Sequence, residues 1–237
     1  MPKRYWYVIL TYIIMQFSVF IFAPILYALT PLGLVESNIY WSIFSFIAAL
    51  FAVLWLMRPD MKAGQHRDAA SAGEMVLWSF AGLFMAYFVN YAASSIETYI
   101  LGITPGSENT QMIMDITRSV PLFMVITAIV APILEEIVFR KIIFGELYKR
   151  MGFFWAAAFS SFIFGIIHDG LEHILIYASI GFVFAFLYVK TKRIIVPVIT
   201  HMVMNSISVI VQLSLDPEDI ENMMKQLEEM QMIIIGG

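Results

Sequence analysis

The stretch Val120–Phe144, VPLFMVITAIVAPILEEIVFRKIIF, decides how this chain folds. It is long and apolar enough for a membrane-spanning helix, which needs about 20 such residues. Yet it holds two adjacent carboxylates, Glu135 and Glu136. A charged side chain at the centre of a bilayer costs about 3 kcal/mol or more, so it is rarely placed there without a function or a partner. The stretch therefore predicts a membrane helix that carries a functional acid.

The composition of the whole chain agrees with a membrane protein. Hydrophobic residues make up 60% and charged residues 14% of the 237 positions, against about half and a quarter in soluble domains. The absence of cysteine excludes disulfides, a cysteine nucleophile and thiolate metal sites. The net charge of −4 and the lack of a basic tract give no reason to expect nucleic acid as a partner. The expected partner is the lipid bilayer.

Hydrophobic runs separated by turn residues predict an all-α bundle of about seven transmembrane helices. The first run is too long for the core of a cleaved signal peptide, about 7–15 residues, and is interpreted as a retained span. The expected spans are residues 5–28, 39–57, 75–96, 120–144, 153–169, 171–189 and 194–214.

Basic residues predict how these spans are oriented. With seven spans, one side of the membrane receives Lys3, Arg4, Arg58, Lys62, Arg67, Lys149, Arg150, Lys190, Lys192 and Arg193. The other side receives only Arg118 and Lys225. Because basic loops stay in the cytoplasm, this asymmetry predicts a multi-pass protein of the cell membrane with a cytoplasmic N-terminus and an external C-terminus.

The chain divides into three regions on this interpretation. Residues 1–118 hold the first three spans with their loops, and residues 119–214 hold the polar motifs. Residues 215–237 form an acidic tail that opens with a helix-start pattern at Asp216-Pro217. Apolar residues at helical spacing in this tail predict an amphipathic helix resting on the protein or on the bilayer surface.

The two adjacent acids are expected to differ in environment. Glu136 and Arg140 are four residues apart, so they share a helix face and can form an ion pair. Glu135 lies about 100° away around the helix and escapes that pair. It is therefore the better candidate for a general base, whereas Glu136–Arg140 can also be read as a purely structural pair. Pro132 is expected to bend the helix near the acids.

Two later spans each carry a histidine with a partner one helical turn away. His168 follows Phe164, which is expected to wall the site, and His201 precedes Asn205, so that imidazole and amide share a face. Together they suit donation to a developing oxyanion, although polar contacts between helices are the alternative. His173 is expected at the surface. By helical rise, His201 is on the order of 10 Å shallower in the membrane than Glu135 and His168.

These three elements in series resemble the CPBP family of intramembrane proteases, also called CAAX protease and bacteriocin-processing or Abi proteins, which includes the type II CAAX prenyl endopeptidases. The family pattern is two glutamates with an arginine four residues later, a phenylalanine four before a histidine, and a histidine four before an asparagine. Here these are Glu135, Glu136 and Arg140, then Phe164 and His168, then His201 and Asn205. The resemblance covers residues 119–212, and spans one to three carry no motif.

The resemblance implies an intramembrane endopeptidase with a peptide or lipidated protein as substrate. Glu135 and His168 would activate water, His201 and Asn205 would hold the oxyanion, and Glu136, Arg140 and Phe164 would support them. Family members are often described as metalloproteases, and Glu135, His168 and His201 could supply three zinc ligands, with Glu136 as the base. Metal-free catalysis is favoured here, because no HExxH helix is present and a zinc site would leave Asn205 without a task.

Two other functions are alternatives to an enzyme. Intramembrane Glu and His residues also form proton relays, so a proton-coupled transporter is one of them. A non-catalytic membrane scaffold or immunity protein that keeps the polar core for packing is the other. The sequence indicates neither the substrate nor the oligomeric state.

Overall fold

The fold is all-α, as the sequence predicts, in a computed structural model that describes residues 1–62, 68–103, 108–169 and 171–214. Within these ranges there is no β-strand. The predicted amphipathic tail, residues 215–237, lies outside the described residues. The helices are α1 Lys3–Leu29, α2 Leu34–Lys62, α3 Ala72–Tyr99, α4 Glu108–Ser119, α5 Phe123–Val125, η1 Ile126–Val130, α6 Ala131–Glu135, η2 Glu136–Phe144, α7 Gly145–Tyr148, α8 Phe153–Asp169, α9 Ile174–Thr191 and α10 Ile195–Ser214.

The helices coincide with the predicted spans. In the described part of the chain, α1, α2, α3 and α9 are long and apolar enough to cross a membrane, and residues 153–168 and 195–211 form shorter apolar helices. Many large apolar side chains point outward from them, such as Phe20, Trp55 and Phe88. A soluble monomer rarely exposes so much apolar surface, whereas a bundle in lipid requires it. The chain is thus a multi-pass membrane bundle. Helix α4, in the predicted break between spans three and four, was not expected.

The run α5–η1–α6–η2–α7 forms one helix, which we call the acid helix. It is not a regular α-helix, because η1 and η2 are π-helical. The amide of Ala131 donates to the carbonyl of Ile126, and that of Gly145 donates to Arg140, both five residues back. Pro132 lies in the first turn of α6 and has no amide hydrogen, so it cannot continue an α-helical ladder. The irregularity expected near Pro132 therefore takes the form of π turns, which are frequent at functional sites.

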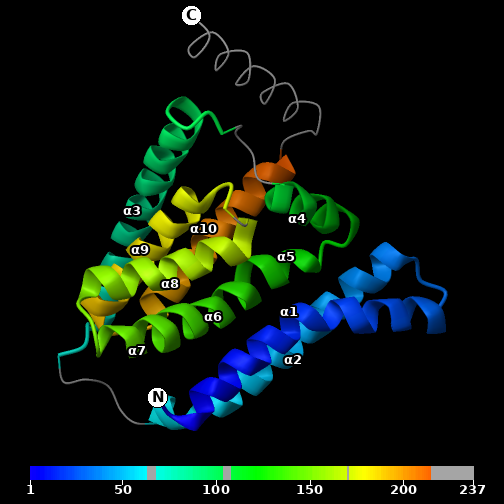
Figure 1. The fold of residues 1–237 in the computed structure, drawn as a ribbon, viewed down its shortest axis with the longest axis horizontal. Helices are drawn as coiled ribbons and strands as arrows, with labels where there is room; N and C mark the ends of the chain where they lie inside the picture. Colours follow the sequence, from blue (N-terminus) through cyan, green and yellow to red (C-terminus); the bar gives the residue numbers. More distant parts are fainter. Residues whose placement is uncertain (63–67, 104–107, 170, 215–237) are drawn as a thin grey trace, which may run out of the picture.

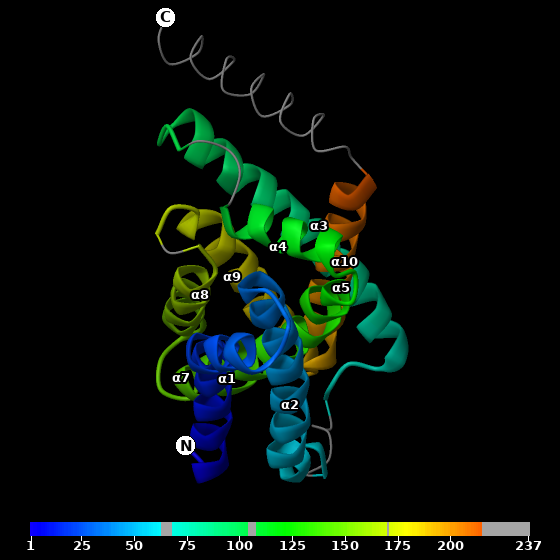
Figure 2. The same ribbon diagram turned by 90° about the vertical axis from the view of Figure 1, so that its right-hand side faces the viewer.

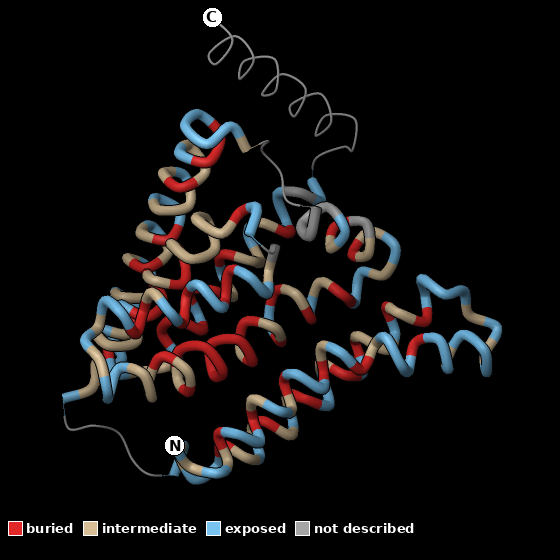
Figure 3. The backbone as a smooth tube through the Cα atoms, viewed as in Figure 1, coloured by how far each residue is buried: buried red, intermediate tan, exposed pale blue. Residues whose placement is uncertain are grey.

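The other helices surround the acid helix. The α1–α2 hairpin packs against η1, α6 and η2, while α8, α9 and α10 contact the acid helix on other sides. Helix α3 lies against α9 and α10. Figures 1 and 2 show this hairpin as a separate arm that passes beside the acid helix. Burial is greatest along α6 and η2, as Figure 3 shows, and this places the two acids at the centre of the bundle.

Candidate active site

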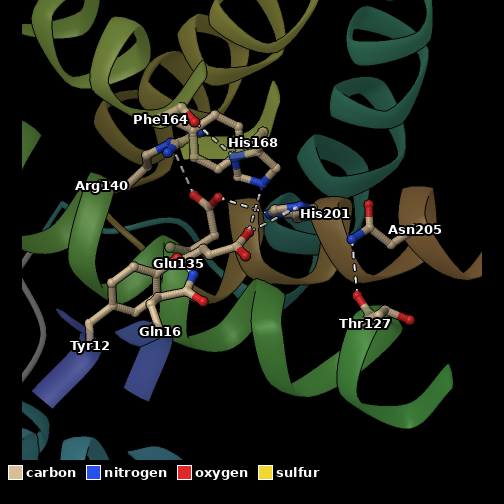
Figure 4. A network of polar contacts seen from close by, with 10 residues as sticks. Tyr12, Gln16, Thr127, Glu135, Arg140, Phe164, His168, His201 and Asn205 are labelled. Atoms are coloured by element: carbon tan, nitrogen blue, oxygen red, sulfur yellow. Dashed lines mark hydrogen bonds and ion pairs between the residues drawn. The ribbon is translucent and has the colours of Figure 1, made fainter. Parts of the chain in front are cut away.

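Glu135 meets both predicted histidines (Figure 4). Its Oε2 atom lies 3.6 Å from Nε2 of His168 on α8 and 3.8 Å from Nε2 of His201 on α10. Glu135 and His201 are only 8% and 5% exposed. These separations are longer than a direct hydrogen bond and suit a water molecule that bridges the groups. The structure therefore brings an acid and two imidazoles from three helices to one buried place.

Hydrogen bonds orient both imidazole rings. Nδ1 of His168 lies 2.8 Å from the backbone carbonyl oxygen of Phe164. A carbonyl can only accept, so this Nδ1 carries the proton and Nε2 is left to face Glu135. Nδ1 of His201 lies 3.0 Å from Oε1 of Glu136 and donates to that carboxylate. If both imidazoles are neutral, each Nε2 carries a lone pair and cannot donate to the Glu135 carboxylate. The cluster therefore needs a shared proton or a bridging water.

Glu136 forms the predicted pair with Arg140, at 3.2 Å between Oε2 and Nε. Both side chains are completely buried. The pair lacks the alignment of a hydrogen bond, so charge attraction holds it together. Glu136 therefore has two partners, Arg140 and His201, and only the first was expected. Glu136 contacts Nδ1 of the His201 ring, whereas Glu135 faces Nε2 of the same ring.

Aromatic rings enclose the guanidinium of Arg140. Its central carbon is 4.3 Å from the ring centroid of Phe164, 5.4 Å from that of Phe184 and 5.8 Å from that of Phe139. Among the described residues, Nη1 and Nη2 have no hydrogen-bond partner. Contact with ring faces stabilises such a desolvated cation by about 2 kcal/mol. The ring centroid of Phe164 also lies 4.0 Å from that of His168, so the two rings are in contact.

Asn205 lies one turn beyond His201 and contacts a different part of the acid helix. Its Nδ2 atom donates to the backbone carbonyl of Thr127, at 3.1 Å. Figure 4 shows it reaching toward Thr127 rather than toward the pair of Glu135 and His168. A carboxamide has two N–H donors, so one remains for another acceptor. Asn205 is thus near the cluster but is not brought into direct contact with its acid.

Helix α1 brings two residues to the cluster that were not among the predicted site residues. Tyr12 is 4% exposed, packs edge-on against Phe139, and accepts a hydrogen bond of 3.2 Å from Nε2 of Gln16. Figure 4 shows Tyr12 and Gln16 beside Glu135, on the side away from His168. Two polar residues at positions i and i+4 in an otherwise apolar span were a signal that could have indicated this. The first span therefore takes part in the site although it carries no motif.

The expectation for His173 was wrong. His173 is 4% exposed, and its Nδ1 lies 2.9 Å from Oε2 of Glu97 on α3. The histidine was assigned to the surface because it stands in a short polar joint. A partner 76 residues away buries it.

The zinc alternative requires Glu135, His168 and His201 to bind one metal ion. Zinc ligand atoms lie about 2.0–2.2 Å from the metal. Ligand atoms at that distance from a tetrahedral zinc lie about 3.4 Å from one another, and the Oε2–Nε2 separations around Glu135, 3.6 and 3.8 Å, are near that value. Glu136, the base in the zinc alternative, is already engaged by Arg140 and by Nδ1 of His201.

An all-α membrane bundle that brings a carboxylate and two imidazoles to one buried place has the groups that a membrane-embedded hydrolase requires. Such a cluster can take a proton from water and return it to a leaving group.

Comparison with known proteins places the chain within that class. The sequence model of one family, Rce1-like (type II CAAX prenyl endopeptidase Rce1-like), matches residues 117–207. The chain is 46% identical over its full length to the putative membrane peptidase YdiL of Bacillus subtilis strain 168, covering 99% of that protein. It is 36% identical to the membrane-embedded CAAX protease MroQ of Staphylococcus aureus strain USA300, over 64% of either chain. No solved structure matches.

The chain therefore belongs to the Rce1-like family of type II CAAX prenyl endopeptidases and is a membrane peptidase. The resemblance drawn from its three motifs is confirmed.

Proposed function

We propose that the protein is an intramembrane endopeptidase in which Glu135 and His168 activate a water molecule for attack on a peptide bond. The observation that carries this proposal is the position of the Glu135 carboxylate, within 4 Å of Nε2 of His168 and of His201. Burial excludes bulk water, so the few charges in the site act with greater strength than they would in solution.

In the first step, Oε2 of Glu135 takes a proton from the water as its oxygen bonds to the peptide carbonyl carbon. The electron pair of the C=O double bond moves onto the carbonyl oxygen, which becomes an oxyanion. In this scheme Nε2 of His201 is the donor to the oxyanion, and the contact of Nδ1 with Oε1 of Glu136 holds the ring in place. The second N–H of the Asn205 amide is the further donor.

In the second step, the C–N bond breaks as the oxyanion re-forms the carbonyl. The leaving amine takes the proton that the Glu135 and His168 pair received from the water. The products are a carboxylic acid and an amine, the acid proton then passes to the amine to give a carboxylate and an ammonium, and Glu135 is ionised again. Glu135 activates the water and the side chains of His201 and Asn205 hold the oxyanion, so the scheme needs no metal and we propose that none takes part.

We propose a peptide or lipidated protein held in the membrane as the substrate. The family is named for prenyl endopeptidases and one relative is named a CAAX protease, which supports a prenylated tail, while a pro-peptide is the other candidate. The asymmetry of basic residues supports a cytoplasmic N-terminus and an external C-terminus.

The test compares membrane-peptide profiles of cells that produce wild-type protein or the Glu135→Ala variant at equal levels. We expect one or more peptides to persist uncut in the variant and to be cleaved at one position by the purified wild-type protein. Identical profiles, or cleavage by purified Glu135→Ala protein, would overturn the proposed mechanism.

A further inference from the structure

A second buried acid lies away from the Glu135 cluster. Glu97, near the end of α3, is 2% exposed. Its Oε1 accepts the backbone N–H of Leu175 at 3.0 Å and that of Ile176 at 3.2 Å, and its Oε2 contacts Nδ1 of His173 at 2.9 Å. This residue precedes residues 117–207, the part of the chain that matches the family.

These contacts make Glu97 a cap for α9 that comes from another helix. The first amides of a helix have no partner within it, and an anion at this end is favoured by the helix dipole. His173 occupies the capping position of α9, but its side chain does not cap the helix. Glu97 supplies the missing acceptor and ties the start of α9 to α3.

The first turn of α9 in turn packs against α8 near His168. Gly165 permits this close approach, because a Cβ there would lie 2.6 Å from Cδ1 of Ile174 and 3.5 Å from Cβ of Tyr177. The ring of Tyr177 lies 5.0 Å from the ring of His168. The amide of Tyr177 donates to the carbonyl of His173 at 3.2 Å, so Glu97 and Tyr177 act on the same turn of helix.

Tyr177 completes the restraint of His168. Phe164 lies against the imidazole at 4.0 Å and its carbonyl oxygen accepts from Nδ1. With Tyr177 also packed against the ring, Nε2 is held in the direction of Glu135.

We propose that Glu97 and His173 form a clamp that positions His168 for the reaction by holding Tyr177 against its ring. Neither clamp residue contacts the reacting atoms, so both are positioning residues rather than catalytic ones. This inference rests on the proposed hydrolysis by Glu135 and His168. A displacement near 1 Å in an active site lowers the rate by up to about 100-fold, which sets the scale of the expected effect.

The test uses purified full-length protein and a cleavable membrane peptide. We expect Glu97→Ala to lower kcat by about 10- to 100-fold with KM changed less than twofold. Glu97→Gln, which keeps an oxygen for the two amides of α9, should recover most of the activity. Glu74→Gln, at the opposite end of the same helix, is the matched control and should cleave like wild type.

Tyr177→Leu tests the link to His168, because it leaves the cap in place. It should lower kcat as Glu97→Ala does, and the double variant should be no slower than the slower single variant, because both changes remove one restraint. Amide hydrogen exchange over residues 171–178 should be faster in Glu97→Ala and unchanged in Glu97→Gln. This readout needs no activity and detects loss of the cap directly.

The clamp would be overturned by normal kcat in Glu97→Ala or in Tyr177→Leu, or by losses that multiply in the double variant. If Glu97→Ala does not fold, Glu97→Gln and Tyr177→Leu still decide the matter. Failure of the proposed function itself gives a different result, since Glu135→Gln would then cleave at the wild-type rate.

Discussion

Oε1 of Glu136 lies 3.0 Å from Nδ1 of the His201 imidazole. The other nitrogen of this ring, Nε2, faces Glu135. The second of the two adjacent acids therefore contacts Nδ1 of His201, while the first faces Nε2 of both His168 and His201. A rotation of about 100° between adjacent residues of the same helix gives two identical side chains different surroundings.

Glu136→Gln should damage both folding and catalysis. It leaves the buried Arg140 without its counter-charge, and breaking a buried pair in this way costs about 3–5 kcal/mol of the free energy of unfolding. It also removes the carboxylate oxygen that accepts from Nδ1 of His201 and orients its ring, so cleavage should fall. Thermal unfolding of the protein in detergent and the rate of peptide cleavage are the two measurements.

A second variant separates these effects. Glu136→Gln combined with Arg140→Leu removes both buried charges and should regain much of the lost stability without regaining activity. Recovery of activity together with stability would mean that Glu136 has only a structural role.

Glu135→Gln should abolish cleavage while the protein still inserts and folds. The amide has nearly the same shape but cannot accept a proton from water, and loss of a general base costs about 10²- to 10⁴-fold in rate. The control is Glu146→Gln at the end of the acid helix, where Glu146 pairs with Lys149 outside the cluster. Single-turnover cleavage by equal amounts of folded protein is the measurement, and equal rates for Glu135→Gln and Glu146→Gln would rule out Glu135 as the base.

The helices, and the residues that share a helix face in each motif, could be predicted from the sequence because both depend on local spacing. Runs of about 20 apolar residues indicate spans, and residues four apart share a helix face, as Glu136 and Arg140 do. The same reasoning placed His201 too shallow to reach Glu135. A π-helical turn holds more residues than an α-helical one, so η2 advances less along its axis than the counted rise assumed. That shortening acts in the direction that brings Glu135 toward the depth of His201.

Contacts between distant segments could not be predicted in this way. Glu97 meets His173 across 76 residues, and no local pattern around either residue indicates the partner. Tyr12 reaches the site only because the α1–α2 hairpin packs on the acid helix. Local patterns therefore identified the residues of the cluster, while the surrounding polar residues needed the tertiary structure.

Tyr12→Phe should slow cleavage moderately. The phenol oxygen already accepts from Gln16, so its own proton is left to donate toward the water or the Glu135 carboxylate. Loss of one neutral hydrogen bond corresponds to about a 2- to 10-fold decrease in rate. Tyr7→Phe is the control, because Tyr7 lies on the same helix and is exposed. An unchanged rate in Tyr12→Phe would show that the hydroxyl serves packing alone.

Gly181→Ala should destabilise the bundle beside Arg140. A Cβ at this position of α9 would lie 2.8 Å from Oγ of Ser161 and 3.2 Å from Nη2 of Arg140. Overpacking of this kind costs about 1–3 kcal/mol. Gly73→Ala is the control, since a Cβ at Gly73 meets nothing within 4 Å and the position is helical, where alanine is favoured over glycine by up to about 1 kcal/mol. Thermal unfolding should therefore shift downward for the first variant and stay level or rise for the second.

Removal of divalent metals should leave cleavage unchanged. In the zinc alternative, Glu135, His168 and His201 would bind the metal and Glu136 would have to act as the base. Glu136 is bound instead to Arg140 and to Nδ1 of His201, and it cannot leave them without uncovering the buried guanidinium of Arg140. Metal analysis of the purified protein, with cleavage measured before and after chelation, compares the two schemes. Stoichiometric zinc whose removal stops cleavage, and whose return restores it, would establish the metal mechanism and reassign Glu135 from base to ligand.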